Sequence, residues 1–254
     1  MGKRFDGKVA FVTGGGSGIG RETALLFAAD GAAVAVVDMA EEHGKQVVTE
    51  IESAGGRAIF VRANVGVAAE VEAAVAATVA AFGRLDYGIN NAGIGGAAAL
   101  AGDYGLDDWH RVIDINLNGV FYGLRYQIPE MRKVGGGVIV NVSSILGLVG
   151  FNAAPAYVAA KHGVMGLTKA AAIDHATENI RVAAVNPGFI ETPLLTSAGI
   201  EKGNDMYTFI ASKHPVNRLG QAEEIARGIV WLCSDEASFV TGVPFVMDGG
   251  YTAQ

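Results

Sequence analysis

Short apolar runs rich in β-branched residues alternate with longer segments of helical periodicity along most of the chain. The clearest run, Val34-Ala35-Val36-Val37, has no polar member, which is typical of a strand covered on both faces. Runs of this kind predict strands at residues 8–13, 33–38, 58–62, 85–89, 137–142, 181–186 and 243–247. The segments between them predict helices at residues 19–29, 41–54, 68–82, 106–133, 155–175 and 222–234.

Regular alternation of strands and helices indicates right-handed crossovers and a parallel sheet. No linker rich in Pro or Ser interrupts it, so residues 1–254 are expected to form one domain. Residues 194–216 interrupt this alternation of strands and helices, and the segment is longer than most connections between elements. This insertion is expected to be a mobile lid or a substrate wall, with an idle surface excursion as the alternative.

Composition narrows the possible partners. Half of the 254 residues are apolar, 36 are glycine, and the net charge is −7 with no basic block. This balance disfavours nucleic acid and anionic membranes as partners. No run approaches the roughly 18 apolar residues of a membrane span, and no signal-type segment opens the chain. A cytoplasmic location is expected.

Cysteine and histidine offer no metal site. The single cysteine, Cys233, lies in an apolar stretch and is expected to be a buried, inert thiol. The five histidines share no spacing typical of metal ligands; they are His43, His110, His162, His175 and His214. His214 lies in the insertion and is the histidine most expected to meet a substrate.

The first predicted strand is followed by Thr13-Gly14-Gly15-Gly16-Ser17-Gly18-Ile19-Gly20 and then by a predicted helix. A glycine turn in this position lets the backbone approach a pyrophosphate, and the helix N-terminus supplies free N–H groups. An acid about 20 residues further on completes the pattern. That acid is Asp38, at the end of the second predicted strand.

Asp38 also bears on the choice of dinucleotide. A carboxylate can accept hydrogen bonds from ribose hydroxyls, whereas it repels a 2′-phosphate. Met39 and Ser17 bring no positive charge, although Arg21 is close in sequence. NAD is therefore predicted as the cofactor, with NADP as the alternative.

Tyr157 and Lys161 are four residues apart in a predicted helix, so their side chains share a face. A neighbouring ammonium lowers the pKa of a phenol from its usual value near 10 toward the range useful for proton transfer. A serine hydroxyl from another segment, such as Ser144, could hold a reacting carbonyl oxygen.

The chain resembles a short-chain dehydrogenase/reductase over essentially its full length. The resemblance rests on Thr13-Gly14-x-x-x-Gly18-x-Gly20, Asn90-Asn91-Ala92-Gly93, Asn116, Ser144, Tyr157-x-x-x-Lys161 and Asn186-Pro187-Gly188. It implies a doubly wound Rossmann fold, with helices on both faces of the sheet, and hydride transfer between NAD(H) and a carbonyl or secondary alcohol.

The resemblance also implies catalytic roles. Tyr157 would be the general acid in reduction and the base in oxidation, and Ser144 would bind the reacting oxygen. Lys161 would lower the pKa of Tyr157 and bind the nicotinamide ribose. Asn116 would anchor a water that links Lys161 to solvent as a proton relay. From its chemistry alone, Asn116 would be read instead as a polar residue that satisfies backbone groups, and only the resemblance gives it a catalytic role.

The same resemblance implies a set of cofactor contacts. Besides Tyr157 and Lys161, the residues expected to contact the dinucleotide are Gly14, Ser17, Gly18, Ile19, Gly20, Asp38, Asn64, Val65, Asn91, Ala92, Gly93, Pro187, Gly188, Ile190 and Thr192. Two departures stand out. Asn64-Val65 occurs where the family often has Asp-Val, and its amide oxygen can still accept from adenine. Tyr87-Gly88 occurs where the family usually has two β-branched or small apolar residues, which affects strand packing.

Small residues surround Tyr157, and they would let a helix face pack closely against a second copy. The resemblance points to a homotetramer. The tail that ends in Gln254 is similar to tails in which the last residue helps to bind a structural magnesium. Simple packing of the tail at an interface is the favoured interpretation, so no metal is predicted.

Two other functions compete with an alcohol dehydrogenase or ketoreductase. A nicotinamide-binding regulatory protein without turnover is the alternative, and the Ser144/Tyr157/Lys161 set argues against it. Enoyl reduction usually comes with a wider Tyr–Lys spacing. The apolar residues near the expected site favour a small hydrophobic substrate over a sugar.

Overall fold

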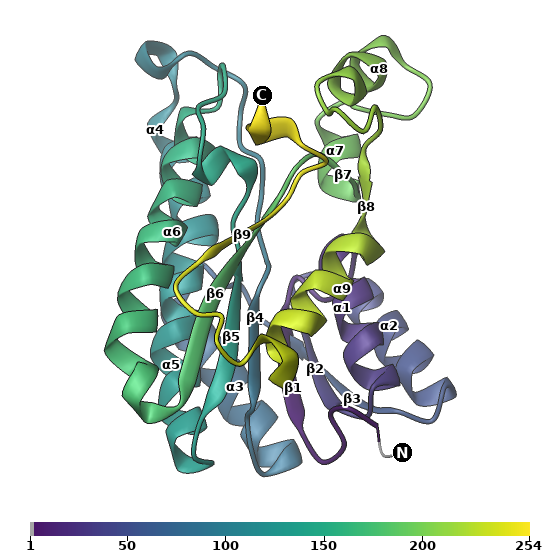
Figure 1. Ribbon diagram of the computed structural model, residues 1–254, viewed down its shortest axis with the longest axis vertical. Coiled ribbons are helices and arrows are strands. Elements are labelled where there is room, and N and C mark those ends of the chain that lie inside the picture. The colour runs from purple at the N-terminus through teal and green to yellow at the C-terminus, as the bar shows by residue number, and fades with distance from the viewer. Residues whose placement is uncertain (1–2) are drawn as a thin grey trace.

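The computed structural model describes residues 3–254. At its centre is a seven-stranded parallel sheet in the order β3-β2-β1-β4-β5-β6-β9, flanked by helices (Figure 1). Its strands are β1 (Val9–Thr13), β2 (Ala33–Asp38), β3 (Arg57–Arg62), β4 (Tyr87–Asn90), β5 (Gly137–Val142), β6 (Ile180–Pro187) and β9 (Pro244–Met247). The predicted doubly wound fold is confirmed.

Helices cover both faces of the sheet, which explains the unbroken apolar runs. One face packs against α1 (Gly18–Ala29), α2 (Glu41–Ser53) and α9 (Ala222–Cys233). The other packs against α3 (Ala68–Phe82), α5 (Gly119–Lys133) and α6 (Pro155–His175). Two apolar cores result, one on each side of the sheet. Within residues 3–254, no helix is long and apolar enough to cross a bilayer.

The strand order reverses between β1 and β4, which pair with each other at the middle of the sheet. The chain winds outward through β2 and β3 on one side and through β5, β6 and β9 on the other. In such sheets a crevice opens at the carboxyl ends of the strands where the winding reverses. The loops that carry the glycine turn and Asn91 leave the sheet at this point.

Two regions differ from the prediction. The single helix expected over residues 106–133 is divided into α4 (Leu106–Ile113), a π-helical stretch (Asp114–Asn118) and α5. The insertion contains α7 (Pro193–Ser197) and α8 (Asp205–Ser212), with the short strands β7 (Ile190–Glu191) and β8 (Gly220–Gln221) at its base. In Figure 1, α7 and α8 project beyond the carboxyl end of the sheet. Local helical periodicity carries no sign of a π turn, which depends on one displaced hydrogen bond.

The unusual Tyr87-Gly88 pair has a packing explanation. The Tyr87 ring lies 5.0 Å from Phe5 and 5.3 Å from Phe27, measured between ring centroids, and the three rings form one aromatic cluster. At Gly88, a Cβ atom would stand 2.2 Å from Oε1 of Gln127. A side chain there would displace this buried amide, so glycine is required by its neighbour.

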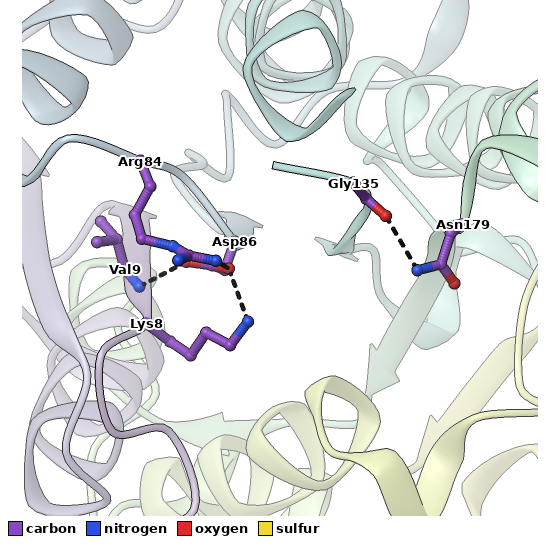
Figure 2. Close-up of polar contacts among 6 residues, drawn as sticks. All are labelled: Lys8, Val9, Arg84, Asp86, Gly135 and Asn179. Carbon is purple, nitrogen blue, oxygen red and sulfur yellow. Dashed lines mark hydrogen bonds and ion pairs between the residues drawn. The ribbon is translucent and has the colours of Figure 1, made fainter. Parts of the chain in front are cut away.

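The amino end of the sheet, opposite the crevice, is fastened by Asp86 (Figure 2). Its buried carboxylate accepts hydrogen bonds from Lys8 at 3.1 Å, from Arg84 at 2.6 Å and from the Val9 amide at 3.0 Å. Asp86 therefore joins the start of β1 to the start of β4. On the same figure, the side-chain amide of Asn179 donates to the carbonyl of Gly135 at 3.1 Å.

Replacing Asp86 tests this junction. Asp86→Ala should lower the free energy of unfolding by about 2 kcal/mol, because it leaves the Val9 amide without its buried partner and removes both ion pairs. Glu223→Ala is the matched control: it breaks the exposed pair with Arg227 and should cost about 0.5 kcal/mol or less. Urea unfolding measures both values, and equal costs would contradict the role given to Asp86.

Candidate active site

A pocket lies at the carboxyl ends of the central strands. It is lined by residues from the ends of β1 to β4 and the segments that follow them, from the π-helical stretch and from the start of α7: Gly14, Ser17, Gly18, Ile19, Val37, Asp38, Met39, Ala63, Asn64, Val65, Asn91, Ala92, Gly93, Ile94, Ile115, Thr192, Pro193 and Leu194. Most of the residues predicted to contact a dinucleotide therefore meet here, although they are spread over 180 positions of the chain.

The glycine turn has the geometry of a phosphate cradle. Gly14 and Gly18 have φ angles of +62° and +51°, in the left-handed region that favours glycine. Gly20 does not line the pocket; a Cβ atom there would stand 2.0 Å from the carbonyl oxygen of Gly14. It is therefore a packing residue that lets α1 begin close to the turn. Ser17 precedes α1 without a side-chain cap, so the first N–H groups of this helix are open to an anion.

Thr13 and Asn91 hold the turn against β4. The hydroxyl of Thr13 accepts from the amides of Asn91 and Ala92 at 2.9 and 3.1 Å. The side-chain amide of Asn91 donates to the carbonyl of Thr13 at 2.9 Å. Thr13 was part of the predicted motif but not of the predicted site. Its role depends on contact across 78 positions, which the sequence alone does not reveal.

Asp38 lines the same pocket at the end of β2. Its carboxylate accepts from the backbone amides of Gly16 and Ala40, each at 2.9 Å, so it is fixed beside the glycine turn. The cation that left the choice of dinucleotide open, Arg21, is engaged elsewhere: its guanidinium forms ion pairs with Glu22 and Glu50. The residues of this pocket fit a dinucleotide: backbone donors for phosphate and a carboxylate for ribose hydroxyls.

Ser144, Tyr157 and Lys161 meet beside this pocket. Ser144 lies two residues beyond the end of β5, whereas Tyr157 and Lys161 lie on α6. The Lys161 ammonium is buried, donates to the carbonyl of Val142 at 2.9 Å, and lies 5.4 Å from the centroid of the Tyr157 ring. The hydroxyl of Ser143, to which the sequence assigned no role, donates to the carbonyl of Lys161 at 3.0 Å.

Asn116 links the two parts of the site. It is buried in the π-helical stretch, and its side chain both accepts from the amide of Ile94 and donates to the carbonyl of Ile94, each at 2.9 Å. A Cβ atom on Gly93 would lie 2.6 Å from Asn116 Oδ1 and 3.6 Å from Lys161 Nζ. Glycine at this position thus keeps the amide and the ammonium close to the dinucleotide pocket.

The pKa of Tyr157 differs from the sequence prediction. Burial raises it to about 12, and a hydrogen bond with Ser144 opposes this effect only in part. Lys161 was expected to lower this pKa, but burial lowers the pKa of its own ammonium to about 8. In the protein without its cofactor the cost of burial is therefore the larger effect, and the lowering of the Tyr157 pKa by Lys161 stays a prediction.

His214 and the C-terminus form a support for the site. His214 is buried, Nε2 accepts from the Phe189 amide at 3.3 Å, and Nδ1 lies 3.0 Å from the carbonyl of Ile210. Its ring packs against Phe189 and Tyr251. Backbone groups thus occupy both nitrogens, and the expectation that His214 meets substrate gives way to a structural role. Nearby, the side-chain amide of Gln254 donates to the carbonyl of Lys213 at 2.7 Å.

Besides Gly20, Tyr157 and Lys161, three more of the predicted contacts do not line the dinucleotide pocket. Gly188 and Ile190 line a second pocket together with His214, and Pro187 lines neither. Cys233 is buried in α9, as predicted, and burial raises the pKa of its thiol to about 12. Within residues 3–254, no three His, Cys, Asp or Glu side chains are grouped so as to hold a metal.

Comparison with known proteins identifies the family. A family model described as enoyl-(acyl carrier protein) reductase matches residues 14–252. Cyclohexanol dehydrogenase of Acinetobacter sp. (strain SE19) is 46% identical over 254 residues, which cover 100% of this chain and 98% of the relative. The chain belongs to the short-chain dehydrogenase/reductase family. It is an oxidoreductase that transfers a hydride between a nicotinamide cofactor and a carbonyl or secondary alcohol.

Other relatives of this short-chain dehydrogenase agree. The cis-4-hydroxycyclohexanecarboxylate dehydrogenase of Sinomonas cyclohexanicum is 44% identical over 253 residues and is covered completely, as is this chain. The crystal structure of levodione reductase superposes with a TM-score of 0.94 at 38% identity, over 98% of this chain and 99% of that one. The fold and the reaction class therefore rest on likeness along the entire chain.

The hydrogen bond between Ser144 and Tyr157 gives a pH prediction. In Ser144→Ala the pKa of Tyr157 rises, because the bond that favours the phenolate is lost. With Tyr157 as the base that the family resemblance implies, alcohol oxidation needs the deprotonated phenol. The rising limb of kcat against pH should therefore move to higher pH, and kcat should fall on the order of 100-fold. Initial rates across an alkaline pH series measure both effects. A limb that stays in place or moves downward would contradict the assignment.

Proposed function

We propose that this short-chain dehydrogenase oxidises small alicyclic secondary alcohols with NAD, and reduces the corresponding ketones. The observation that carries the proposal is the meeting of Ser144, Tyr157 and Lys161 beside a pocket that suits a dinucleotide. Two relatives whose names specify a cyclohexanol or a hydroxycyclohexane ring support the substrate class.

Each catalytic residue has a proposed part. Ser144 binds the reacting oxygen, and Tyr157 removes the hydroxyl proton in oxidation or supplies it in reduction. Lys161 binds ribose hydroxyls and stabilises the phenolate, and Asn116 holds a water on the path from Lys161 to solvent. When bound, the oxidised nicotinamide supplies a hydride acceptor and a positive charge. That charge adds to the charge of Lys161 and favours the phenolate that burial opposes.

The dinucleotide contacts follow the lining of the pocket. Gly14, Ser17, Gly18 and Ile19 surround the phosphates, and Asp38 binds the adenosine ribose. We propose that Asn64 and Val65 hold the adenine, with Asn91, Ala92 and Gly93 along the ribose side. Pro187, Gly188, Ile190 and Thr192 remain proposed for the carboxamide end, and of these Thr192 lines the pocket.

Residues 194–216 are proposed as the substrate wall or lid of one domain that spans the chain. Leu194 lines the dinucleotide pocket, and Met206 and Phe209 on α8 are exposed apolar side chains. The hydroxyl of Tyr207 donates to the carboxylate of Glu191, which ties α8 to β7. An apolar, tethered segment above the site suits a hydrophobic ring better than a sugar.

Self-association is also proposed. Ala159 and Gly166 are exposed small residues on α6, and Ile173 on the same helix is 79% exposed. Such a helix face can pack closely against a second copy, in keeping with a homotetramer. The cytoplasmic location stays a prediction.

Turnover with a single-atom control tests the proposed function. Purified protein with NAD should oxidise cyclohexanol and substituted cyclohexanols faster than linear polyols or sugars. Tyr157→Phe should lower kcat on the order of 1,000-fold, because the proton acceptor is lost, while NAD still binds in calorimetry. Full turnover by Tyr157→Phe would refute the mechanism, and faster oxidation of polyols would refute the substrate class.

The preference for NAD depends on one carboxylate. Asp38→Ala should raise KM for NAD about tenfold and improve the use of NADP, because the repulsion of the 2′-phosphate is removed and Arg62 stands opposite in register. Glu41→Gln is the control, since Glu41 pairs with Lys45 and does not line the pocket. The ratio of kcat/KM for the two cofactors is the measurement. An unchanged ratio in Asp38→Ala would contradict the assignment.

A further inference from the structure

Asn186 lies directly beneath the catalytic serine. It is fully buried at the carboxyl end of β6, where its side-chain amide donates to the carbonyl of Ser144 at 2.8 Å. The same nitrogen lies 3.5 Å from the sulfur of Met165 on α6. Asn186 thus stands between β6, α6 and the segment that presents the Ser144 hydroxyl.

The contribution of Asn186 to stability is unfavourable in one respect. Its Oδ1 atom is buried and has no hydrogen-bond partner among residues 3–254. A buried acceptor without a partner destabilises a fold, because its hydrogen bonds to water are lost without replacement. An apolar side chain of the same size would avoid this penalty.

The carbonyl of Ser144 does not depend on Asn186 for a partner. It also accepts from the backbone amide of Gly147 at 2.9 Å, so it stays satisfied when the side chain of Asn186 is removed. The hydrogen bond from Asn186 instead fixes the orientation of this carbonyl. Two donors, one from β6 and one from the following turn, fix the orientation of the peptide group after Ser144.

The position of the Ser144 hydroxyl follows from this peptide. Its oxygen accepts from the amide of Leu146 at 3.1 Å, two residues beyond the fixed carbonyl, and it also hydrogen-bonds to Tyr157. A rotated carbonyl would move Leu146 and release the hydroxyl. Displacement of a catalytic group by about 1 Å can cost on the order of 100-fold in rate.

We infer that Asn186 is a positioning residue for catalysis, which holds the Ser144 peptide so that its hydroxyl faces Tyr157 and the reacting oxygen, at the expense of an unpaired buried amide oxygen. The inference rests on the proposed roles of Ser144 and Tyr157. Loss of a buried polar residue ordinarily lowers both activity and stability. For Asn186 we expect a lower catalytic rate with an unchanged or higher melting temperature.

The test is Asn186→Leu, which has nearly the same shape without the amide. Its melting temperature should equal or exceed that of the parent, since no buried polar group is left without a partner. Because the Ser144 peptide loses its hydrogen bond from Asn186, the Ser144 hydroxyl is no longer held in place. The kcat for alcohol oxidation should therefore fall at least about tenfold. The rising limb of kcat against pH should move upward, as in Ser144→Ala, whereas the Kd for NAD should stay unchanged.

Thr168→Val is the matched control, because it also removes a buried polar side chain that hydrogen-bonds between the sheet and α6. Thr168 is buried on α6 and accepts from the side-chain amide of Asn141 at 3.0 Å, whereas the hydrogen bonds of Ser144 involve Leu146, Gly147 and Asn186. Its loss leaves a buried donor unpaired, so the melting temperature should fall while the pH limb stays in place. If Asn186→Leu does not fold, Asn186→Ala is measured in the same way, because it adds no bulk.

The pH limb decides the outcome. An upward shift in the Asn186 variant supports the positioning role, and a limb at the parent value overturns it, whatever the melting temperature. Failure of the proposed function looks different, because Tyr157→Phe would then retain turnover. Loss of turnover in Tyr157→Phe together with an unaltered Asn186 variant would overturn this inference alone.

Discussion

Three hydrogen bonds tie the carboxyl end of β5 to its neighbours, and the geometry of the proposed catalytic groups depends on them. Lys161 donates from its buried ammonium to the carbonyl of Val142, Ser143 donates back to the carbonyl of Lys161, and Asn186 donates to the carbonyl of Ser144. Three consecutive residues of one strand end are thereby fixed against α6 and β6. Burial of the Lys161 ammonium removes most of its hydration, which disfavours the charged form and lowers its pKa.

A layer of polar side chains lies below this junction, in the middle of an otherwise apolar core. Asn90 exchanges hydrogen bonds with Gln127 and donates to Asn141, which in turn donates to Thr168. The layer joins β4 and β5 to α5 and α6. Buried polar networks of this kind specify one arrangement of the surrounding elements, because a shifted register would leave several donors and acceptors unpaired. The proposed catalytic groups therefore lie next to a fully hydrogen-bonded layer, while the more exposed helices of the insertion lie above them.

The amino end of the sheet stabilises the fold, and the carboxyl end carries the ligand-binding groups. At the amino end, Asp86 fastens β1 to β4 through partners that are all supplied by the chain. At the carboxyl end, the first N–H groups of α1 and the carboxylate of Asp38 suit the phosphates and the ribose of a dinucleotide. Parallel strands make this division possible, because every crossover returns to the amino end and leaves the loops after the strands free to vary.

Local sequence patterns were sufficient to predict the type of each element and the chemistry of the motifs. Apolar runs marked the strands to within a few residues because each strand is buried on both faces, and the glycine turn, Asp38 and the Tyr157/Lys161 pair were recognisable because their spacing along the chain is fixed by local geometry. Tertiary structure decided the strand order, the π-helical stretch at Asn116, the structural role of His214, the raised pKa of Tyr157 and the place of Asn186 beneath Ser144. Each of these depends on groups far apart in the chain. Burial and long-range hydrogen bonds arise only once the sheet is assembled, so no local pattern contains them.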